Sequence, residues 1–239
     1  MRVMPIVKKE LRSYFNSPIA YVVTIAFLVF TAVWFLYLNQ FLFQNVASLR
    51  GYFSIVPIIY VVVIPALCMR IWAEERRLGT AEILFTLPYR EWELVAGKFA
   101  AAFVLLVVIA LLTIPLPLTL FPLGDFQKGQ IVGEYLGMLL LGAAAVSIGQ
   151  FISSLVLNQI SAFIGGVVAL LFITLIGSVN AYMDLPAWLA STLNWVSFRS
   201  HFESFDKGLL DSRDLLYFLL VTALFLYLTT KSLARGRWR

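Results

Sequence analysis

Residues that could carry chemistry are few in this chain and do not form a familiar constellation. Among 239 residues there is one histidine, His201, and one cysteine, Cys68. His201 is followed by Asp206, Asp211 and Asp214, which raises the idea of a metal site, but zinc and haem sites need more than a single histidine. Cys68 lies inside an apolar run, so a disulfide framework and a redox motif are excluded. We interpret the region around His201 as an ordinary solvated loop.

Nucleotide and hydrolase motifs are also missing from the sequence. The nearest fragment to a phosphate-binding loop is Gly97-Lys98, but Trp92 stands where the first glycine belongs and Phe99 replaces the hydroxyl residue. Neither His-Glu-x-x-His nor Gly-x-Ser-x-Gly occurs. The sequence therefore predicts a chain that is not an enzyme, with no catalytic residue and no cofactor or metal site of its own.

Composition places the chain in a membrane. It is 61% hydrophobic and only 13% charged, whereas a soluble domain of this length would expose far more charge. The formal net charge of +5 invites a nucleic-acid interpretation. However, the basic residues cluster beside apolar runs, where they hold helix ends at the membrane surface, so the predicted partner is the lipid bilayer and no nucleic acid.

Six uncharged stretches are long enough to cross a bilayer, which takes about 20 apolar residues each. The predicted spans cover residues 19–40, 52–71, 98–121, 132–156, 160–181 and 211–233. The first of them follows a basic segment, as in a signal peptide. Because Ile19–Leu38 is long and aromatic and no small-residue cleavage pattern follows it, we expect an uncleaved helix. The whole of 1–239 is expected to form a single all-α transmembrane domain.

Orientation follows from lysine and arginine in the connecting segments. If both termini are cytoplasmic, 13 of the 18 basic residues lie on the cytoplasmic side. The five on the other side are Arg50, Lys128, Arg199, Lys207 and Arg213. This bias predicts a multi-pass membrane protein with both termini in the cytoplasm.

Three further segments do not span. Residues 1–17 have apolar side chains at helical spacing and basic ones opposite, a pattern that predicts an amphipathic helix in the membrane interface. Residues 72–97 form a charged cytoplasmic segment between spans two and three. Residues 181–213 mix aromatic and charged side chains, which suits short, re-entrant-type helices at the outer interface before span six.

The predicted span interiors hold no ionisable side chain, and Glu134 is expected at the mouth of span four. Ion-coupled transporters usually carry such groups within their spans, so any transport energy is expected to enter from outside the bilayer. Small residues also recur one turn apart in the spans. The pairs are Gly133 and Gly137, Ala145 and Gly149, and Ser161 and Gly165. Close packing within one chain is the favoured interpretation, with a dimer face or a translocation path as the alternative.

The segment 72–97 has local signals for a short helix. Gly79 permits a break, Thr80 can cap a new helix, and Glu82 is favourably placed in its first turn. Pro88 then ends the element. The predicted apolar face consists of Leu78, Ala81, Leu84 and Phe85. These features predict a charged helix held against the cytoplasmic surface of the membrane.

The order of residues in this segment resembles the ABC-2 type permeases, the membrane subunits of one class of ATP-binding-cassette transporter. The matching fragments are Glu74-Glu75-Arg76, Gly79-Thr80-Ala81-Glu82-Ile83-Leu84, Leu87-Pro88 and Gly97-Lys98. In that family the loop forms a coupling helix that sits in a groove of the ATPase subunit. The resemblance thus implies coupling residues at Glu74, Glu75, Arg76, Gly79, Thr80, Glu82, Leu84, Leu87 and Pro88. The stretch Phe198–Tyr217 is similar to the gliding-motility permeases and to permeases of copper-enzyme maturation clusters.

The resemblance also implies partners and a function. We expect a permease subunit that couples ATP hydrolysis to export, with two copies of an ABC ATPase subunit and a second permease, identical or homologous. ATP and magnesium would be bound by the ATPase and not by this chain. The alternative is a non-transporting scaffold that transmits ATPase strokes to an extracytoplasmic partner protein, as a gliding-motility-type system would require.

Overall fold

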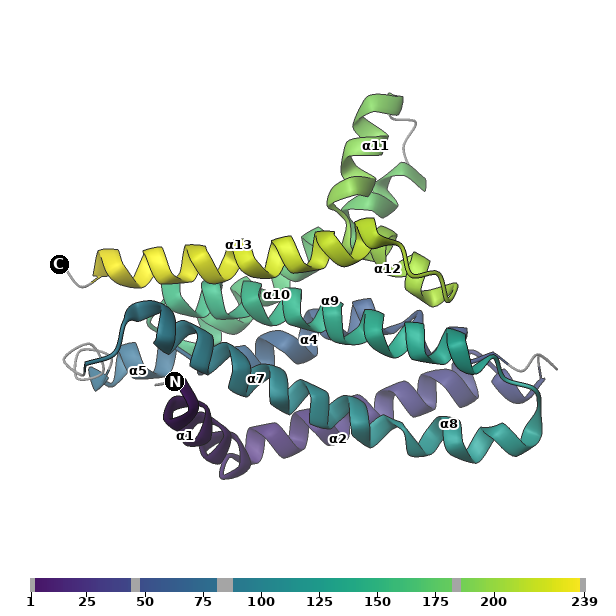
Figure 1. Cartoon of the computed structure of the whole chain (residues 1–239), viewed down its shortest axis with the longest axis horizontal. Helices are drawn as coiled ribbons and strands as arrows, with labels where there is room; N and C mark the ends of the chain where they lie inside the picture. The colour runs from purple at the N-terminus through teal and green to yellow at the C-terminus, as the bar shows by residue number, and fades with distance from the viewer. Residues whose placement is uncertain (1–2, 44–47, 81–87, 182–185, 237–239) are drawn as a thin grey trace.

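The computed structural model describes residues 3–43, 48–80, 88–181 and 186–236, and every regular element in these ranges is helical. The helices form an elongated bundle, with α5 and the C-terminus towards one end and α8 and α12 towards the other (Figure 1). We call these the α5 end and the α12 end. Within the described residues, six helices are long and apolar enough to cross a membrane, which confirms the predicted number.

The candidate spans agree closely with the hydropathy prediction. They run over Pro18–Leu38, Arg50–Arg77, Glu91–Leu120, Lys128–Leu155, Gln159–Asn180 and Ser212–Ala234. Four of them are divided into shorter elements, and the fifth span consists of α10 (Gln159–Leu175) and the 3-10 helix η4 (Ile176–Ala181). The first consists of α2 (Pro18–Val33) and a π-helical turn (Trp34–Leu38), the second of α3 (Arg50–Phe53), α4 (Val56–Cys68) and α5 (Ala73–Arg77), and the third of α7 (Glu91–Thr113) and α8 (Pro115–Leu120).

Proline positions account for several of these boundaries. Pro18 and Pro115 stand in the first turn of α2 and α8, where a missing backbone N–H costs nothing. The longer α9 (Lys128–Leu155), α10 (Gln159–Leu175) and α13 (Ser212–Gly236) have no proline. The side chain of Asn158 caps α10 by accepting from the N–H of Ile160 at 3.2 Å.

The helix α9 forms the centre of the bundle and packs against α4, α7, α10, α12 and α13. Its glycines allow the close approach. A β-carbon on Gly137 would lie 2.6 Å from Cβ of Phe205, and one on Gly149 would lie 2.9 Å from Cβ of Cys68. A β-carbon on Gly165 would lie 3.1 Å from Cγ2 of Ile152, so these three glycines pack within the chain, while Ser161 of the third pair is exposed.

Among the described residues, three α-helices lie outside the six spans. The helix α1 (Val3–Phe15) packs across the start of α7 (Figure 1). The helix α11 (Ala187–Val196) follows the short turn η4 (Ile176–Ala181) and projects away from the bundle, with no buried residue. The helix α12 (Phe198–Asp206) turns back and buries Phe198, Phe202 and Phe205 against the bundle. Short helices thus exist within 1–17 and 181–213, where the sequence predicts them, while the helix predicted after Gly79 falls on residues 81–87, outside the described residues.

Candidate functional site

The predicted coupling residues gather at the α5 end of the bundle. Glu74, Glu75 and Arg76 belong to α5, and Gly79 and Thr80 follow it. Pro88 lies just ahead of α7. Glu82, Leu84 and Leu87, together with Ala81 and Phe85 of the predicted apolar face, lie outside the described residues.

Both ends of α5 are fixed by identifiable contacts. At its start, Oγ of Ser153 in α9 accepts hydrogen bonds from the backbone N–H groups of Trp72 and Ala73, at 3.1 and 3.2 Å. At its end, Gly79 has φ of +70°, which favours glycine and stops the helix after Arg77, where the sequence predicts a break. The hydroxyl of Thr80 donates back to the carbonyl of Glu75 at 3.3 Å.

A buried lysine joins α5 to two other helices. Lys98 in α7 is only 2% exposed, and its Nζ lies 2.9 Å from Oε1 of Glu75 and 3.0 Å from Oε1 of Glu10 in α1. It also donates to the carbonyl of Ile71 at 3.0 Å and lies 4.8 Å from the centre of the Trp72 ring. The ammonium group is therefore fully coordinated inside the chain. We call Lys98, Glu10 and Glu75 the Lys98 cluster.

The glycine beside Lys98 explains how α1 reaches this cluster. A β-carbon on Gly97 would lie 2.7 Å from Cγ2 of Ile6, so only glycine lets Ile6 pack against α7. Glu10 stands one helical turn after Ile6 and is thereby brought to Lys98. The Gly97-Lys98 pair thus has a structural role and no resemblance in shape to a phosphate-binding loop.

The other charged residues of α5 are also braced by the chain itself. Glu74 accepts two hydrogen bonds from Arg70, at 2.6 and 3.0 Å, and Arg70 also donates to Oγ of Ser17 at 2.8 Å. Arg76 donates to the carbonyl of Ser154 in α9. A cavity of about 260 Å³ lies among these side chains and α1. Because Glu74, Glu75 and Arg76 bond within the chain, they set the position of α5.

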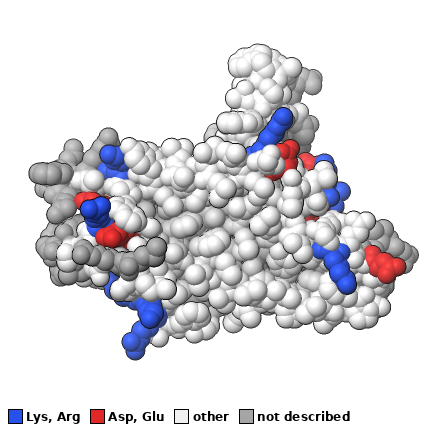
Figure 2. Space-filling view, in the orientation of Figure 1, with Lys and Arg blue, Asp and Glu red and all other residues white. Residues whose placement is uncertain are grey.

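The outward face of the α5 end consists of other residues. Arg77, Leu78, Gly79 and Thr80 are exposed, and Leu78 has 62% of its surface accessible. Trp92 in the first turn of α7 is also exposed, at 51%. On the face drawn in Figure 2, charged side chains gather towards the two ends of the bundle and an uncharged band lies between them. The α5 end thus offers both charge and apolar surface.

Two charged residues near the ends of the candidate spans are buried inside the chain. Lys98 lies within the candidate span Glu91–Leu120, and Glu134, expected at a span mouth, is fully buried in α9. Oε1 of Glu134 accepts a hydrogen bond from the amide of Gln130 at 2.9 Å. Hydropathy averaging over a window does not report the partners of a single charge, so the burial and the hydrogen bonds of Lys98 and Glu134 were not found from sequence.

A second charged group occupies the α12 end. Asp206 is 5% exposed and forms an ion pair with Arg50, with Nε and Oδ2 at 2.8 Å. Burial raises the pKa of Asp206, and the hydrogen bond from Arg50 opposes that shift. Gln130 ties the same turn to α9 by donating to the carbonyl of Asp206 at 3.2 Å. Asp206 is therefore a structural residue, and the expectation of a solvated loop here is wrong.

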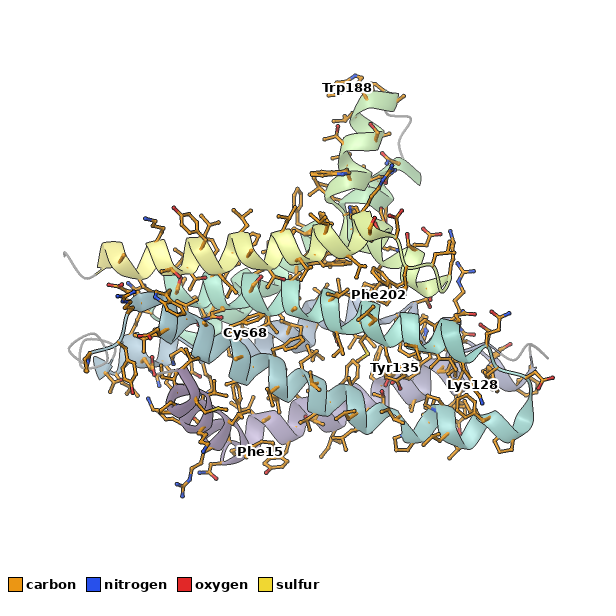
Figure 3. All side chains as sticks on the ribbon, in the orientation of Figure 1. Phe15, Cys68, Lys128, Tyr135, Trp188 and Phe202 are labelled. Carbon is orange, nitrogen blue, oxygen red and sulfur yellow. The ribbon has the colours of Figure 1, made fainter. Side chains whose placement is uncertain are left out.

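His201 likewise has specific partners. Its ring bonds to Asp214 and to the carbonyl of Trp195, and it stacks on Tyr217. In the part of the chain that the structure describes, no three histidine, cysteine or acidic side chains are grouped to hold a metal ion. Trp188 marks the tip of α11, far from Phe202 and Cys68 inside the bundle (Figure 3).

Six helices long and apolar enough to cross a membrane, with a charged element at one end, are the pattern of a polytopic membrane protein. The sequence matches the family of ABC-2 family transporter proteins over residues 37–230. The chain therefore belongs to this family, as a non-catalytic transmembrane chain.

Two relatives are similar in sequence as well. YbhR of Escherichia coli strain K12, described as a probable multidrug ABC transporter permease, is 31% identical over 171 residues. Its counterpart in Escherichia coli O157:H7 is equally similar. The match covers 70% of this chain and 46% of each relative, so the chain spans about half the length of the relatives it matches. These comparisons do not support the gliding-motility branch that the sequence suggested.

Proposed function

We propose that this chain is the permease subunit of a bacterial ABC-2 transporter and that an ABC ATPase docks on the α5 end. Family membership supports the general role. The observation that carries the docking site is the exposed surface of Arg77 and Leu78 at the end of α5 and of Trp92 at the start of α7. The side chains of Glu75 and Arg76 tie α5 to α1, α7 and α9.

The proposed assembly contains two ATPase copies, which bind ATP and magnesium, and a second permease, identical or homologous. Residues 1–239 act as one transmembrane domain in the bacterial inner membrane. The α5 end faces the cytoplasm together with both termini, α1 lies in the cytoplasmic interface, and α11 and α12 lie at the outer interface. The excess of lysine and arginine in the segments at the α5 end supports this orientation.

Coupling in this scheme runs through contacts that can be named. A displacement of α5 by the ATPase is carried to α7 and α1 by the Lys98 cluster and to α9 by Ser153. Since α9 packs against most of the bundle, a shift of α5 can be transmitted to the other spans as a rigid-body rearrangement. Glu74, Glu75 and Arg76 then act by positioning α5, and Arg77, Leu78 and the segment up to Pro88 make the contact.

Substitutions on the exposed surface test the docking site. Leu78→Glu places a charge on an apolar contact and should lower copurification of the cognate ATPase about tenfold or more, because burying a leucine contributes about 1.5–3 kcal/mol. Leu209→Glu is the matched control, since Leu209 is 61% exposed at the α12 end. Equal ATPase recovery from both variants would remove the docking assignment. Glu75→Lys is unsuitable, because it sets a second cation against Lys98.

Cargo and mode of action need a separate measurement. Because the relatives are described as probable multidrug permeases, small hydrophobic compounds are the first cargo to test. Stimulation of ATPase activity by such compounds in proteoliposomes would favour export. Stimulation by an extracytoplasmic protein alone would favour the scaffold role, of which the gliding-motility type is one form.

A further inference from the structure

His201 in α12 faces a hydrogen-bond acceptor at each ring nitrogen. Its Nδ1 lies 2.6 Å from Oδ1 of Asp214 in α13, and its Nε2 lies 2.8 Å from the carbonyl oxygen of Trp195 in α11. A carbonyl oxygen only accepts, so Nε2 carries a proton. A second proton must lie between Nδ1 and Asp214, on one atom or the other. The pair therefore holds one proton more than a neutral histidine beside an ionised aspartate.

The bond from Nε2 of His201 to the carbonyl of Trp195 lies at the C-terminal end of α11. The hydroxyl of Tyr217 donates to the carbonyl of Val196 at 2.6 Å, and the imidazole stacks on the Tyr217 ring with centroids 3.8 Å apart. A positive charge at the C-terminus of a helix is favourable. At the other side of α11, Asn180 donates to the carbonyl of Ala190 at 3.1 Å. Because α11 buries no residue, it is held by these bonds, by the hydrogen bond from Asn180 to Oδ1 of Asn194, by the edge contact of the Trp195 and Tyr217 rings, and by its contacts with η4 and α12.

The charged surroundings of His201 are simple. From α13 it faces Asp214, Tyr217 and the apolar ring of Phe218. The helices α11, α10 and α4 have no ionisable side chain apart from Tyr60 and Cys68 of α4. On α9, Glu134 is bonded to Gln130 beside the far end of α12, and α12 itself carries Arg199, Glu203 and Asp206. Asp214 is thus the one carboxylate bonded to the ring among the described residues.

We propose that His201 and Asp214 form a proton-dependent latch that holds α11 to α13. With the extra proton bound, both ring nitrogens have a partner and the end of α11 is fixed. Once that proton is lost, one acceptor oxygen faces a nitrogen lone pair, and the bond to Trp195 or to Asp214 is broken. Proton concentration at this surface therefore controls the attachment of α11.

Release would move a large aromatic surface. Trp188 and Trp195 are about equally exposed, at 70% and 69%, and stand two helical turns apart on α11. The hydroxyls of Ser191 and Thr192 donate to the carbonyl of Trp188, so these two hydroxyl groups have a hydrogen-bond acceptor within α11 and do not depend on water for one. The latch therefore controls the position of an uncharged helix suited to a membrane interface.

Distances between α11 and α13 test the latch without any partner protein. The full chain with Cys68→Ala would carry Ser191→Cys and Leu220→Cys, both at exposed positions, for spin labels. Pulsed electron paramagnetic resonance in lipid nanodiscs would compare about pH 5.5 with about pH 8.5, on either side of ordinary histidine titration. We expect a narrow distance distribution at the lower pH and a broader, shifted one at the higher pH.

Two variants should respond in opposite ways. His201→Phe keeps a ring on Tyr217 but has no donor, so the distribution should be broad at both pH values. Asp214→Asn should give the narrow distribution at both, because an amide can donate to a neutral imidazole while Nε2 still donates to Trp195. Tyr217→Phe is the control and should retain the pH response. A pH-independent wild type, a narrow distribution in His201→Phe or a preserved pH response in Asp214→Asn would each overturn the proposal.

Discussion

Lys98 has an ammonium group with three oxygen acceptors and almost no contact with water. Removing a lysine from water costs several kcal/mol, which only close and well-oriented acceptors can offset. Two carboxylates face this one ammonium, and Lys9 approaches the same two at 4.0 and 3.7 Å. Lys9, Glu10, Glu75 and Lys98 are therefore neutral as a group of four, which limits the desolvation cost of burying it.

Replacing Lys98 should be far more damaging than replacing Lys9. In Lys98→Met, Glu10 and Glu75 lose their buried counter-ion, and we expect the free energy of unfolding to fall by about 3–5 kcal/mol. Lys9→Met removes a lysine near the same carboxylates, but its side chain is 63% exposed, so the loss should stay below about 1 kcal/mol. Denaturation of the two purified variants in detergent provides the comparison. Similar losses would contradict the role given to Lys98.

Among the elements, those defined by local pattern could be predicted from sequence. The six spans and the short helices α1, α11 and α12 follow from apolar run length and helical spacing. The pairing of Lys98 with Glu10 could not, since the two residues are 88 positions apart and periodicity reports only which face of one helix is apolar. The same holds for Ser153, which looks like an ordinary small residue in an apolar helix. Its function appears only once α5 is placed against α9.

The cap on α5 gives a prediction at the scale of the element. Ser153→Ala leaves the N–H groups of Trp72 and Ala73 without an acceptor, and loss of a cap typically costs about 0.5–2 kcal/mol. Hydrogen exchange of the amides of α5 should therefore become faster. Ser154→Ala is the matched control, because that hydroxyl donates only to the carbonyl of Phe151 within α9. If α5 remained equally protected in both variants, Ser153 would not hold it in place.

At the scale of the whole molecule, the two ends of the bundle differ in the way their charges are used. The α5 end holds a neutral group of four charges and presents exposed side chains from Arg77 to Thr80. The α12 end holds the Arg50–Asp206 pair. Such a difference is expected of a membrane protein whose two sides meet different partners.

Accessibility of single cysteines tests the proposed orientation. In a chain with Cys68→Ala, Gln127→Cys at the α12 end should react with an impermeant thiol reagent added to intact cells. Arg77→Cys at the α5 end should react only after the membrane is opened. Both positions are exposed, so the comparison reports sidedness rather than burial. Labelling of Arg77→Cys in intact cells would mean that the α5 end faces outward, and it would contradict the proposed orientation.

The order of Glu10, Glu75 and Lys98 along the chain has a consequence for biogenesis. A ribosome makes both carboxylates before it makes the lysine that they surround. Glu10 of α1 and Glu75 of α5 can therefore stay hydrated at the same membrane surface until α7 is made. When α7 arrives, Lys98 meets two acceptors already in place and never has to enter the bilayer as an isolated charge. Its arrival also locks α1 to the bundle, so insertion of the third span completes the first folding unit of the chain.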